Sequence, residues 1–144
     1  MATRIYQGRK FDNRQVAAVE DALTLEEALQ ININGKPFTL SMRTPGADEL
    51  LVRGLLHSEG IINSTEYHPK MVFSKTDETD IVSVVDMEIP VDYLGSGYSN
   101  SRSLLSVSSC GICGKTELGE LDMQGETLEA STQFPAEAFT DMFE

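Results

Sequence analysis

The stretch LQININGKPFTLSM, residues 29–42, decides the expected fold of this chain. Apolar residues alternate with polar ones on both sides of its central Asn34-Gly35 pair. Alternation with a period of two is typical of half-buried strands, and Asn-Gly is the favoured pair for a type I′ turn of two residues. The pattern therefore predicts a β-hairpin that turns at Asn34 and Gly35.

The turn type also predicts how the two strands pair. It places Ile31 opposite Phe38 and Leu29 opposite Leu40, so that the apolar residues of both strands lie on one face. Pro37 has no N–H to donate to a neighbouring strand, and its strand is therefore expected at an edge of the sheet.

A helical pattern follows in RTPGADELLVRGLLHSEGII, residues 43–62. Thr44 can cap the start of a helix, Pro45 suits the first helical position, and Gly60 suits the C-terminal cap. The helix is expected to lie across the apolar face of the hairpin. Its predicted core residues are Leu50, Leu51, Leu55, Ile61 and Ile62.

Three other residues of this stretch need an explanation. Gly54 is a costly residue inside a helix, and a close approach to a strand is the structural reason that we expect for it. Arg43 and Glu59 can form a structural pair or belong to a surface that binds a partner, and both readings stay open.

Two further strands are predicted in MVFSK, residues 71–75, and DIVSVVDMEI, residues 80–89, around a polar turn. Residues 1–28 have no clear period, and we expect a loose arm there with a short helix over residues 24–29. The fold class that follows is α+β, with a small, mainly antiparallel sheet built from hairpins and one long helix packed on it.

Composition limits the class of protein. The 144 residues are 40% hydrophobic and 24% charged, which suits a domain with its own core. The net charge of −12 argues against nucleic acid as a partner, because the chain repels a phosphate backbone. No apolar run is long enough for a membrane span, and the polar N-terminus has no secretory signal. We therefore expect a cytoplasmic protein.

Both cysteines of the chain lie in SSCGICGK, residues 108–115, in a Cys-x-x-Cys pair. Gly111 and Gly114 permit a tight turn that bares backbone N–H groups, and Lys115 adds a positive charge that favours a thiolate. These features indicate a reactive pair, Cys110 and Cys113, in an exposed loop.

Four readings of the pair stay open on spacing alone. A structural zinc site needs four ligands, and one chain offers two thiolates, with His57 and His68 far upstream. A thioredoxin-type pair fits the serine-rich surroundings poorly. The remaining readings are covalent carriage of sulfur, which needs a nucleophilic thiolate, and two small side chains without reactivity.

The order of the elements adds a resemblance. An Asn-Gly hairpin, the motif T-P-G-x-D-E-L-x-x-x-G-L-L-x-S-E-G-I-I over residues 44–62 and the motif S-C-G-x-C-G over residues 109–114 are together similar to the formate dehydrogenase accessory protein family. The resemblance covers residues 29–118.

The resemblance implies a function. Members of this family are sulfur carriers, also described as accessory sulfurtransferases, which take sulfur as a persulfide from a cysteine desulfurase. They pass it to the molybdenum cofactor, in its bis-guanine dinucleotide form, before that cofactor enters formate dehydrogenase. On this reading Cys110 carries the persulfide, Cys113 assists its transfer or release, and no cofactor or metal is tightly bound.

The resemblance also implies a domain organisation. We expect an N-terminal arm over residues 1–28, an α+β core domain over 29–94, a Ser/Gly-rich segment with the cysteine loop over 95–126, and an acidic linker over 127–144. The family's second domain, which is related to cytidine deaminases, would start within the last range and is otherwise expected to be absent. The cofactor-binding residues are expected in that second domain.

The sequence leaves an alternative function and the oligomeric state open. The alternative function is a small interaction module that shares a four-thiolate zinc site across a dimer. A homodimer is compatible with either function.

Overall fold

The computed structural model of the chain describes residues 2–12, 15–75, 80–99, 117–120, 134–135, 137–140 and 142. The chain divides into two compact units. The larger unit comprises residues 1–2 and 25–122, and the smaller unit comprises residues 3–24 and 123–144. No helix within the described ranges has the length and apolar character that crossing a membrane requires.

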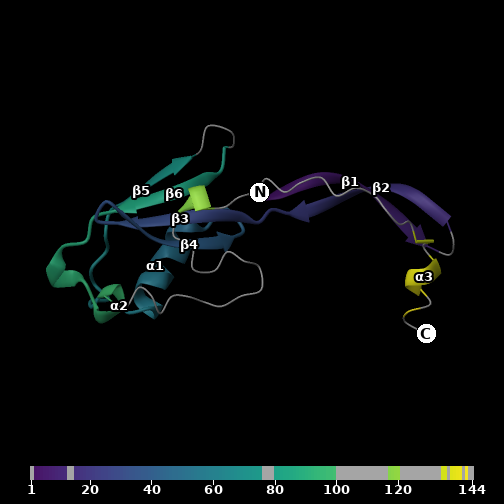
Figure 1. The fold of residues 1–144 in the computed structure, drawn as a ribbon. Coiled ribbons are helices and arrows are strands. Elements are labelled where there is room, and N and C mark those ends of the chain that lie inside the picture. The colour runs from purple at the N-terminus through teal and green to yellow at the C-terminus, as the bar shows by residue number, and fades with distance from the viewer. Residues whose placement is uncertain are drawn as a thin grey trace. The chain divides into compact units, whose positions relative to one another are not determined.

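The larger unit is a sheet of four strands with one long helix on it (Figure 1). The strands are β3 (Glu27–Ile33), β4 (Lys36–Arg43), β5 (Met71–Lys75) and β6 (Val82–Met87), and the helix is α1 (Asp48–Ser58). The strand order is β4-β3-β6-β5. Two antiparallel hairpins are joined by a parallel pairing of β3 with β6. The predicted α+β class and the two later strands are confirmed.

The predicted type I′ turn between β3 and β4 is confirmed. Asn34 and Gly35 have φ angles of 53° and 71°, the left-handed values that this turn requires at both positions. The Asn34 side chain also exchanges two hydrogen bonds with the backbone of Ile89, which accepts from its Nδ2 at 3.0 Å and donates to its Oδ1 at 2.7 Å. Asn34 thus fixes the end of the neighbouring strand as well as the turn.

The predicted register of this hairpin is wrong beyond the turn. Ile31 pairs with Thr39 rather than Phe38, and Leu29 pairs with Ser41 rather than Leu40, because the register shifts by one residue next to Pro37. Proline in a sheet is tolerated at edge strands and bulges, and β4 is an edge strand, as predicted.

The bulge moves Leu40 to the other face of the sheet. Leu40 pairs with Gln30, and directly paired residues share a face, so Leu40 lies on the face opposite to Leu29 and Ile31. Leu40 is only 9% exposed, yet it does not belong to the cluster of apolar side chains around α1. The sheet therefore buries apolar surface on both faces.

Helix α1 begins later than predicted. Its first residue is Asp48 and its N-cap is Ala47. Gly46 has a φ of 127°, which only glycine adopts readily, so the Pro45-Gly46 pair forms a turn before the helix. The predicted end is confirmed, since Gly60 follows the last turn with a φ of 61°.

The buried face of α1 differs in part from the predicted one. Val52 and Leu56 are its buried residues, whereas Leu50 is 74% exposed, so the prediction of Leu50 in the core is wrong. A methyl group on Gly54 would meet nothing within 4 Å. The expected close approach of a strand to Gly54 is therefore wrong too.

The core lies between α1 and the sheet. Leu51 and Leu55 pack against it from its border, as predicted. The buried apolar residues of this core are Leu29, Ile31, Ile33, Phe38, Val52, Leu56, Ile61, Ile62, Val85, Met87 and Ile89.

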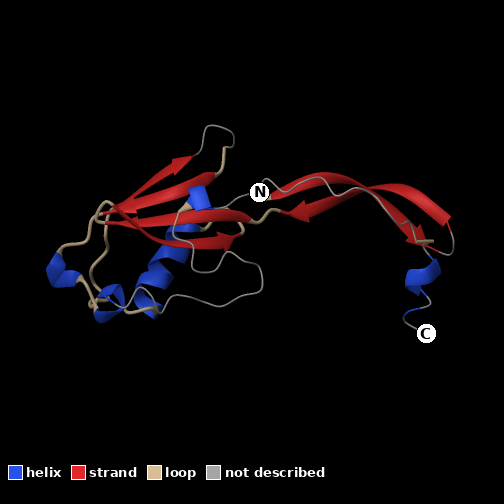
Figure 2. Ribbon diagram, in the orientation of Figure 1, coloured by secondary structure: helices blue, strands red, loops and turns tan. Residues whose placement is uncertain are grey.

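The smaller unit contains a long hairpin, β1 (Thr3–Asp12) and β2 (Gln15–Thr24), whose strands pair along their whole length (Figure 2). The loose arm expected over residues 1–28 is thus largely a ribbon of two strands. The helix expected over residues 24–29 is wrong, because β3 begins at Glu27. A short helix, α3 (Glu137–Thr140), lies within the range 127–144 that was predicted as an acidic linker. The domain boundaries after residues 28, 94 and 126 stay a prediction.

Candidate functional site

Cys110 and Cys113, the predicted site residues, lie outside the described residues, as do the glycines and the lysine beside them. The structure does describe the chain on both sides of residues 100–116. Upstream lies the short helix α2 (Ser96–Ser99), and downstream lies the 3₁₀ helix η3 (Leu118–Glu120). Both flanks are held by contacts with the larger unit.

The upstream flank packs backbone against backbone on the end of α1. The N–H of Gly95 donates to the carbonyl of Ile61 at 2.8 Å, and the N–H of Gly97 donates to the carbonyl of Gly60 at 3.0 Å. A Cβ on Gly95 would lie 2.2 Å from the Gly60 oxygen, and one on Gly97 would lie 1.9 Å from the Glu59 oxygen. These approaches require glycine.

The sequence gives no direct signal for this contact. The serine-rich composition after Gly95 predicts a loop, whereas the structure uses the two glycines to seat α2 against residues 59–62. Residues 59–62 are the E-G-I-I end of the helix motif, so this packing connects the helix motif to the segment that leads into the cysteine motif. Tyr98 of α2 then stacks on Phe38, with ring centroids 5.8 Å apart and planes 11° from parallel.

The downstream flank is fixed by a side-chain network on the other face of the sheet. The N–H of Leu118 donates to Oε1 of Gln30 at 2.8 Å. Gln30 in turn donates through Nε2 to Oδ1 of Asn32 at 2.9 Å, and Asn32 donates through Nδ2 to Oδ1 of Asp86 at 2.8 Å. Three linked hydrogen bonds thus connect β6 and β3 to η3, which lies beside β3 (Figure 1).

The two flanks are held on opposite faces of the sheet. Gln30 alternates along β3 with Leu29 and Ile31, so the face that receives η3 is not the face that carries α1. Tyr98, by contrast, borders the core on the α1 side. The upstream flank is therefore attached at the end of α1 and the downstream flank at β3, on opposite faces of the sheet.

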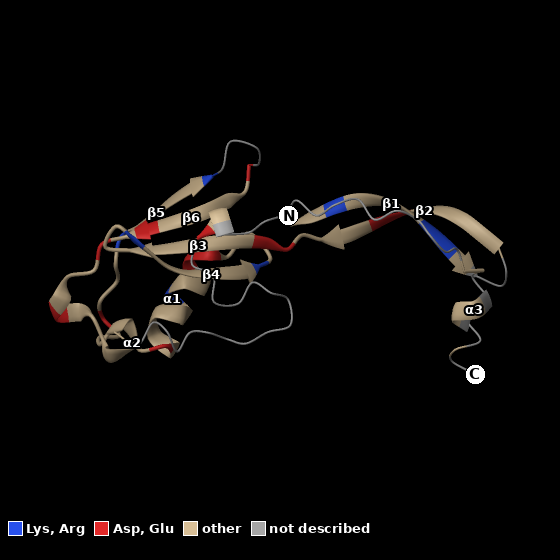
Figure 3. Ribbon diagram, viewed as in Figure 1, with Lys and Arg blue, Asp and Glu red and all other residues tan. Residues whose placement is uncertain are grey.

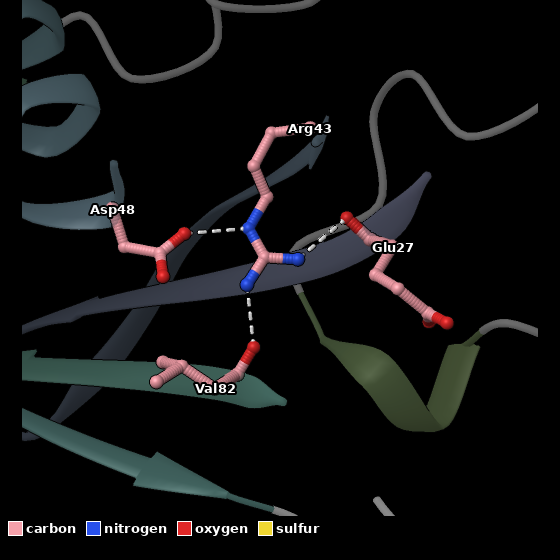
Figure 4. A network of polar contacts seen from close by, with 4 residues as sticks. All are labelled: Glu27, Arg43, Asp48 and Val82. Atoms are coloured by element: carbon pink, nitrogen blue, oxygen red, sulfur yellow. Dashed lines mark hydrogen bonds and ion pairs between the residues drawn. The ribbon is translucent and has the colours of Figure 1, made fainter. Parts of the chain in front are cut away.

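A buried arginine fixes the start of the helix motif (Figure 4). The Arg43 guanidinium donates to Asp48 Oδ1 at 2.8 Å, to the Glu27 carbonyl at 3.1 Å and to the Val82 carbonyl at 2.5 Å. The side chains of Arg43 and Asp48 are 6% and 12% exposed. The partner of Arg43 is thus Asp48, and the suggested pairing of Arg43 with Glu59 is wrong.

This network ties four elements together. Arg43 ends β4, Asp48 opens α1, and the two carbonyls belong to β3 and β6. Asp48 also lies where the positive end of the helix dipole stabilises a carboxylate. The Arg and Asp of the stretch R-T-P-G-x-D therefore have a structural role, because they close the turn that carries Pro45 and Gly46.

A cavity of about 480 Å³ opens beside this turn, and its lining includes Pro45, Gly46, Asp48, Lys75 and Asp80. Asp80 accepts a hydrogen bond from the Lys75 ammonium, and this bond, together with the positive charge, lowers the pKa of Asp80 below its ordinary value. The charged groups in this cavity are thus paired with one another or with Arg43.

The two histidines have surface positions. His57 is exposed on α1. His68 is exposed too and lies with its Nδ1 2.6 Å from Nη1 of Arg53. Among the described residues, no group of three or more His, Cys, Asp or Glu side chains is placed to hold a metal ion.

Comparison with known proteins identifies the family. The model of the FdhD/NarQ family matches residues 24–144, which include Cys110 and Cys113. The chain belongs to the FdhD/NarQ family. The resemblance to formate dehydrogenase accessory proteins that the two motifs carry is confirmed.

Several curated relatives are identical to the chain at about a third of the aligned positions. The sulfur carrier protein FdhD of Streptomyces avermitilis is 33% identical, over 77% of this chain and 43% of its own length. The sulfur carrier protein FdhD of Nocardia farcinica is 37% identical, over 83% of this chain and 40% of its own length. The chain thus spans about two fifths of the length of the curated relatives that it matches.

A solved structure is also similar. It is the crystal structure of a protein named a "putative formate dehydrogenase accessory protein", from Desulfotalea psychrophila, with a TM-score of 0.49 and 15% identity. The similarity covers 64% of this chain and 39% of that one.

Proposed function

We propose that this chain is the sulfur-accepting part of a sulfur carrier, with Cys110 as the residue that receives the sulfur. The observation that supports the proposal most is the family match, which spans both cysteines, together with curated relatives that are named sulfur carrier proteins. The fixed flanks on either side of the cysteine segment suit a group that must be presented to two different partners.

The chemistry of loading is a thiolate exchange. The Cys110 thiolate attacks the terminal sulfur of a persulfide on a cysteine desulfurase, a bond forms between the two sulfurs, and the desulfurase cysteine leaves as a thiolate. The product is a persulfide on Cys110, and no external oxidant or reductant is needed. The desulfurase is regenerated for another molecule of L-cysteine.

The chemistry of release gives Cys113 its role. Its thiolate attacks Sγ of Cys110, which forms a disulfide between the two cysteines and expels the terminal sulfur as hydrosulfide after uptake of one proton. The sulfur gains the two electrons that the cysteines lose. A cellular dithiol must then reduce the disulfide before the next cycle.

The proposed acceptor is the molybdenum cofactor in its bis-guanine dinucleotide form, and the proposed client is formate dehydrogenase. This acceptor is a substrate that visits the carrier. The support is the family membership, together with the resemblance of the two motifs to formate dehydrogenase accessory proteins. Neither the acceptor nor the client is assigned to particular residues of this chain.

The turnover of the desulfurase tests the loading step. A carrier that removes the persulfide frees the desulfurase, so alanine release from L-cysteine should rise when the chain is added. Cys110→Ala should abolish the stimulation, and Cys113→Ala should keep it, since Cys113 acts after loading. Equal stimulation by wild type and Cys110→Ala would contradict the proposal.

Zinc content distinguishes the alternative function. A four-thiolate site shared by two chains predicts one zinc ion for two chains and unfolding when a chelator removes it. The sulfur-carrier proposal predicts a melting temperature that does not respond to a chelator.

A further inference from the structure

Three polar side chains on one face of the sheet hold the chain just after the cysteine segment. The backbone N–H of Leu118 donates to Oε1 of Gln30. Gln30 then donates through its amide nitrogen to Asn32, and Asn32 donates through its own to Asp86. All three side chains lie on the face opposite to α1, because they alternate with buried core residues along β3 and β6. We call Gln30, Asn32 and Asp86 the anchor network.

The carboxylate at the end of the anchor network sets the direction of its hydrogen bonds. Strand β6 carries one charged residue, Asp86 (Figure 3). A carboxylate only accepts hydrogen bonds, so Asn32 must turn its NH2 group toward Asp86. The oxygen of Asn32 then faces Gln30, which must turn its own NH2 group toward Asn32 and so keeps its oxygen for another donor. The anchor network therefore selects a donor from η3, and the backbone N–H of Leu118 is that donor.

The anchor network holds a residue that is close in sequence to the cysteine motif, residues 109–114. Leu118 follows Cys113 by five residues, and five residues of extended chain span at most about 18 Å. The upstream attachment is further away, because Tyr98 precedes Cys110 by twelve residues. The bond to Leu118 is therefore the nearer of the two attachments, and it has the larger effect on where the two cysteines can lie.

We propose that the residues of the anchor network are positioning residues for sulfur loading, which hold the cysteine motif where a cysteine desulfurase can reach it. This inference rests on the proposed function. Loading requires that the Cys110 thiolate meets a persulfide on another protein in one geometry, and a segment that is ordered beforehand loses less conformational entropy when the partner binds. Without the bond to Leu118, the competent arrangement is a smaller fraction of the population, and the apparent affinity for the partner falls by that fraction.

The anchor network should act on the presentation of the thiol and leave its reactivity unchanged. It bonds to the backbone of Leu118, which lies outside the cysteine motif, so its loss alters no group beside the thiols in sequence. The KM of the desulfurase for the carrier should then rise, because fewer molecules have the competent arrangement, while reaction with a small reagent stays as it was. A residue needed only for folding would not separate these two quantities.

Steady-state kinetics of alanine release by the desulfurase, with the full chain as the varied substrate, test the proposal. Gln30→Met should raise the KM for the carrier about fivefold, the change in population expected from one lost hydrogen bond, and leave kcat unchanged. Asn32→Leu should raise the KM too, because Gln30 is then free to turn its NH2 group toward Leu118. The rate at which the thiols react with a small aromatic disulfide should stay within about twofold of wild type in both variants.

Ser74→Met is the matched control, because it places the same side chain on the same face of the sheet outside the anchor network. Ser74 is exposed on β5 and pairs with Val84, which pairs in turn with Gln30. A wild-type KM in Gln30→Met, or an equal rise in Ser74→Met, would overturn the proposal while loading itself stands. A wild-type chain that does not stimulate the desulfurase would instead contradict the proposed function, and this inference with it, so the two failures are distinct.

Discussion

The backbone N–H of Leu118 and the Oε1 of Gln30 form a hydrogen bond of 2.8 Å across 88 residues of sequence. Leu118 is the second described residue after the cysteine segment, and this bond fixes it to the middle of the central strand β3. The Gln30 side chain is fixed in this position, because its amide nitrogen donates a hydrogen bond to Asn32, and Asn32 donates one to Asp86.

Replacement of Gln30 should loosen this attachment. Gln30→Met removes the acceptor, and the loss of one hydrogen bond worth about 1 kcal/mol should speed amide hydrogen exchange at Leu118 about fivefold. Gln30→Glu is the matched control, because it keeps a side-chain oxygen at the same position. Exchange at Leu118 that is equally fast in wild type and Gln30→Met would show that the bond does not form in solution.

Replacement of Gly97 and of Gly54 by alanine should change the folding stability in opposite directions. Gly97→Ala places a methyl group 1.9 Å from the Glu59 oxygen, and displacement of that backbone should cost about 1–3 kcal/mol of folding free energy. Gly54→Ala adds a methyl group in open space on a helix and should stabilise the protein by about 0.5–1 kcal/mol. Urea denaturation of both variants measures the difference.

The contrast between these glycines shows what sequence patterns miss. Gly54 sits inside a clear helical pattern and suggests a tight contact, but the structure has none there. Gly97 sits in a serine-rich stretch that suggests only a loop, and it makes one of the closest backbone approaches among the described glycines. Composition does not reveal such contacts, because they depend on a segment that is distant in sequence.

The hairpin of β3 and β4 shows that neighbouring residues determine the turn type but not the strand register. Asn34 and Gly35 determine the turn through their own backbone preferences, and that prediction is confirmed. The register beyond the turn depends on Pro37, which is accommodated by a bulge and so sends Leu40 to the second face. The alternating pattern alone favours the unshifted register, since it counts Leu40 as a core residue.

The candidate site, like the hairpin, could be predicted only in part. The two motifs are sufficient for the family, which the match over residues 24–144 confirms. The roles of Gln30, Asn32 and Asp86 could not be predicted, because in the sequence these residues are only the polar members of strands in which polar and apolar residues alternate. The roles of Cys110 and Cys113 stay predictions.

The Arg43–Asp48 pair should contribute much more stability than the neighbouring Arg53–Glu49 pair. Asp48→Asn leaves the buried Arg43 charge without a counter-ion and should cost about 3 kcal/mol. Glu49→Gln is the matched control in the same helical turn. It breaks a pair whose side chains are 32% and 57% exposed, and should cost about 0.5 kcal/mol or less.

Thermal unfolding of both variants compares the pairs. Similar melting temperatures for Asp48→Asn and Glu49→Gln would contradict the structural role assigned to Arg43.

Asp80 should titrate below the ordinary range of an aspartate. The hydrogen bond from Lys75, and then the Lys75 charge, favour the carboxylate in the folded state, so the pKa falls on folding. A depressed pKa stabilises the folded state at neutral pH, and that stabilisation is lost as the pH falls through the folded-state value. Because Asp80 is fully exposed, salt should weaken the effect.

Nuclear magnetic resonance titration of the Asp80 carboxyl carbon measures this pKa. Lys75→Met should raise it toward the value of a free aspartate, and an unchanged pKa would mean that the pair does not persist in solution.

The central claim is that Cys110 accepts sulfur, and mass spectrometry of the cysteine-containing peptide tests it most directly. The chain is incubated with a cysteine desulfurase and L-cysteine, the thiols are alkylated, and the peptide is examined without reductant. One added sulfur atom is expected on Cys110 in wild type and in Cys113→Ala, and none in Cys110→Ala. A peptide that gains no sulfur, or that gains it equally in Cys110→Ala, would contradict the account.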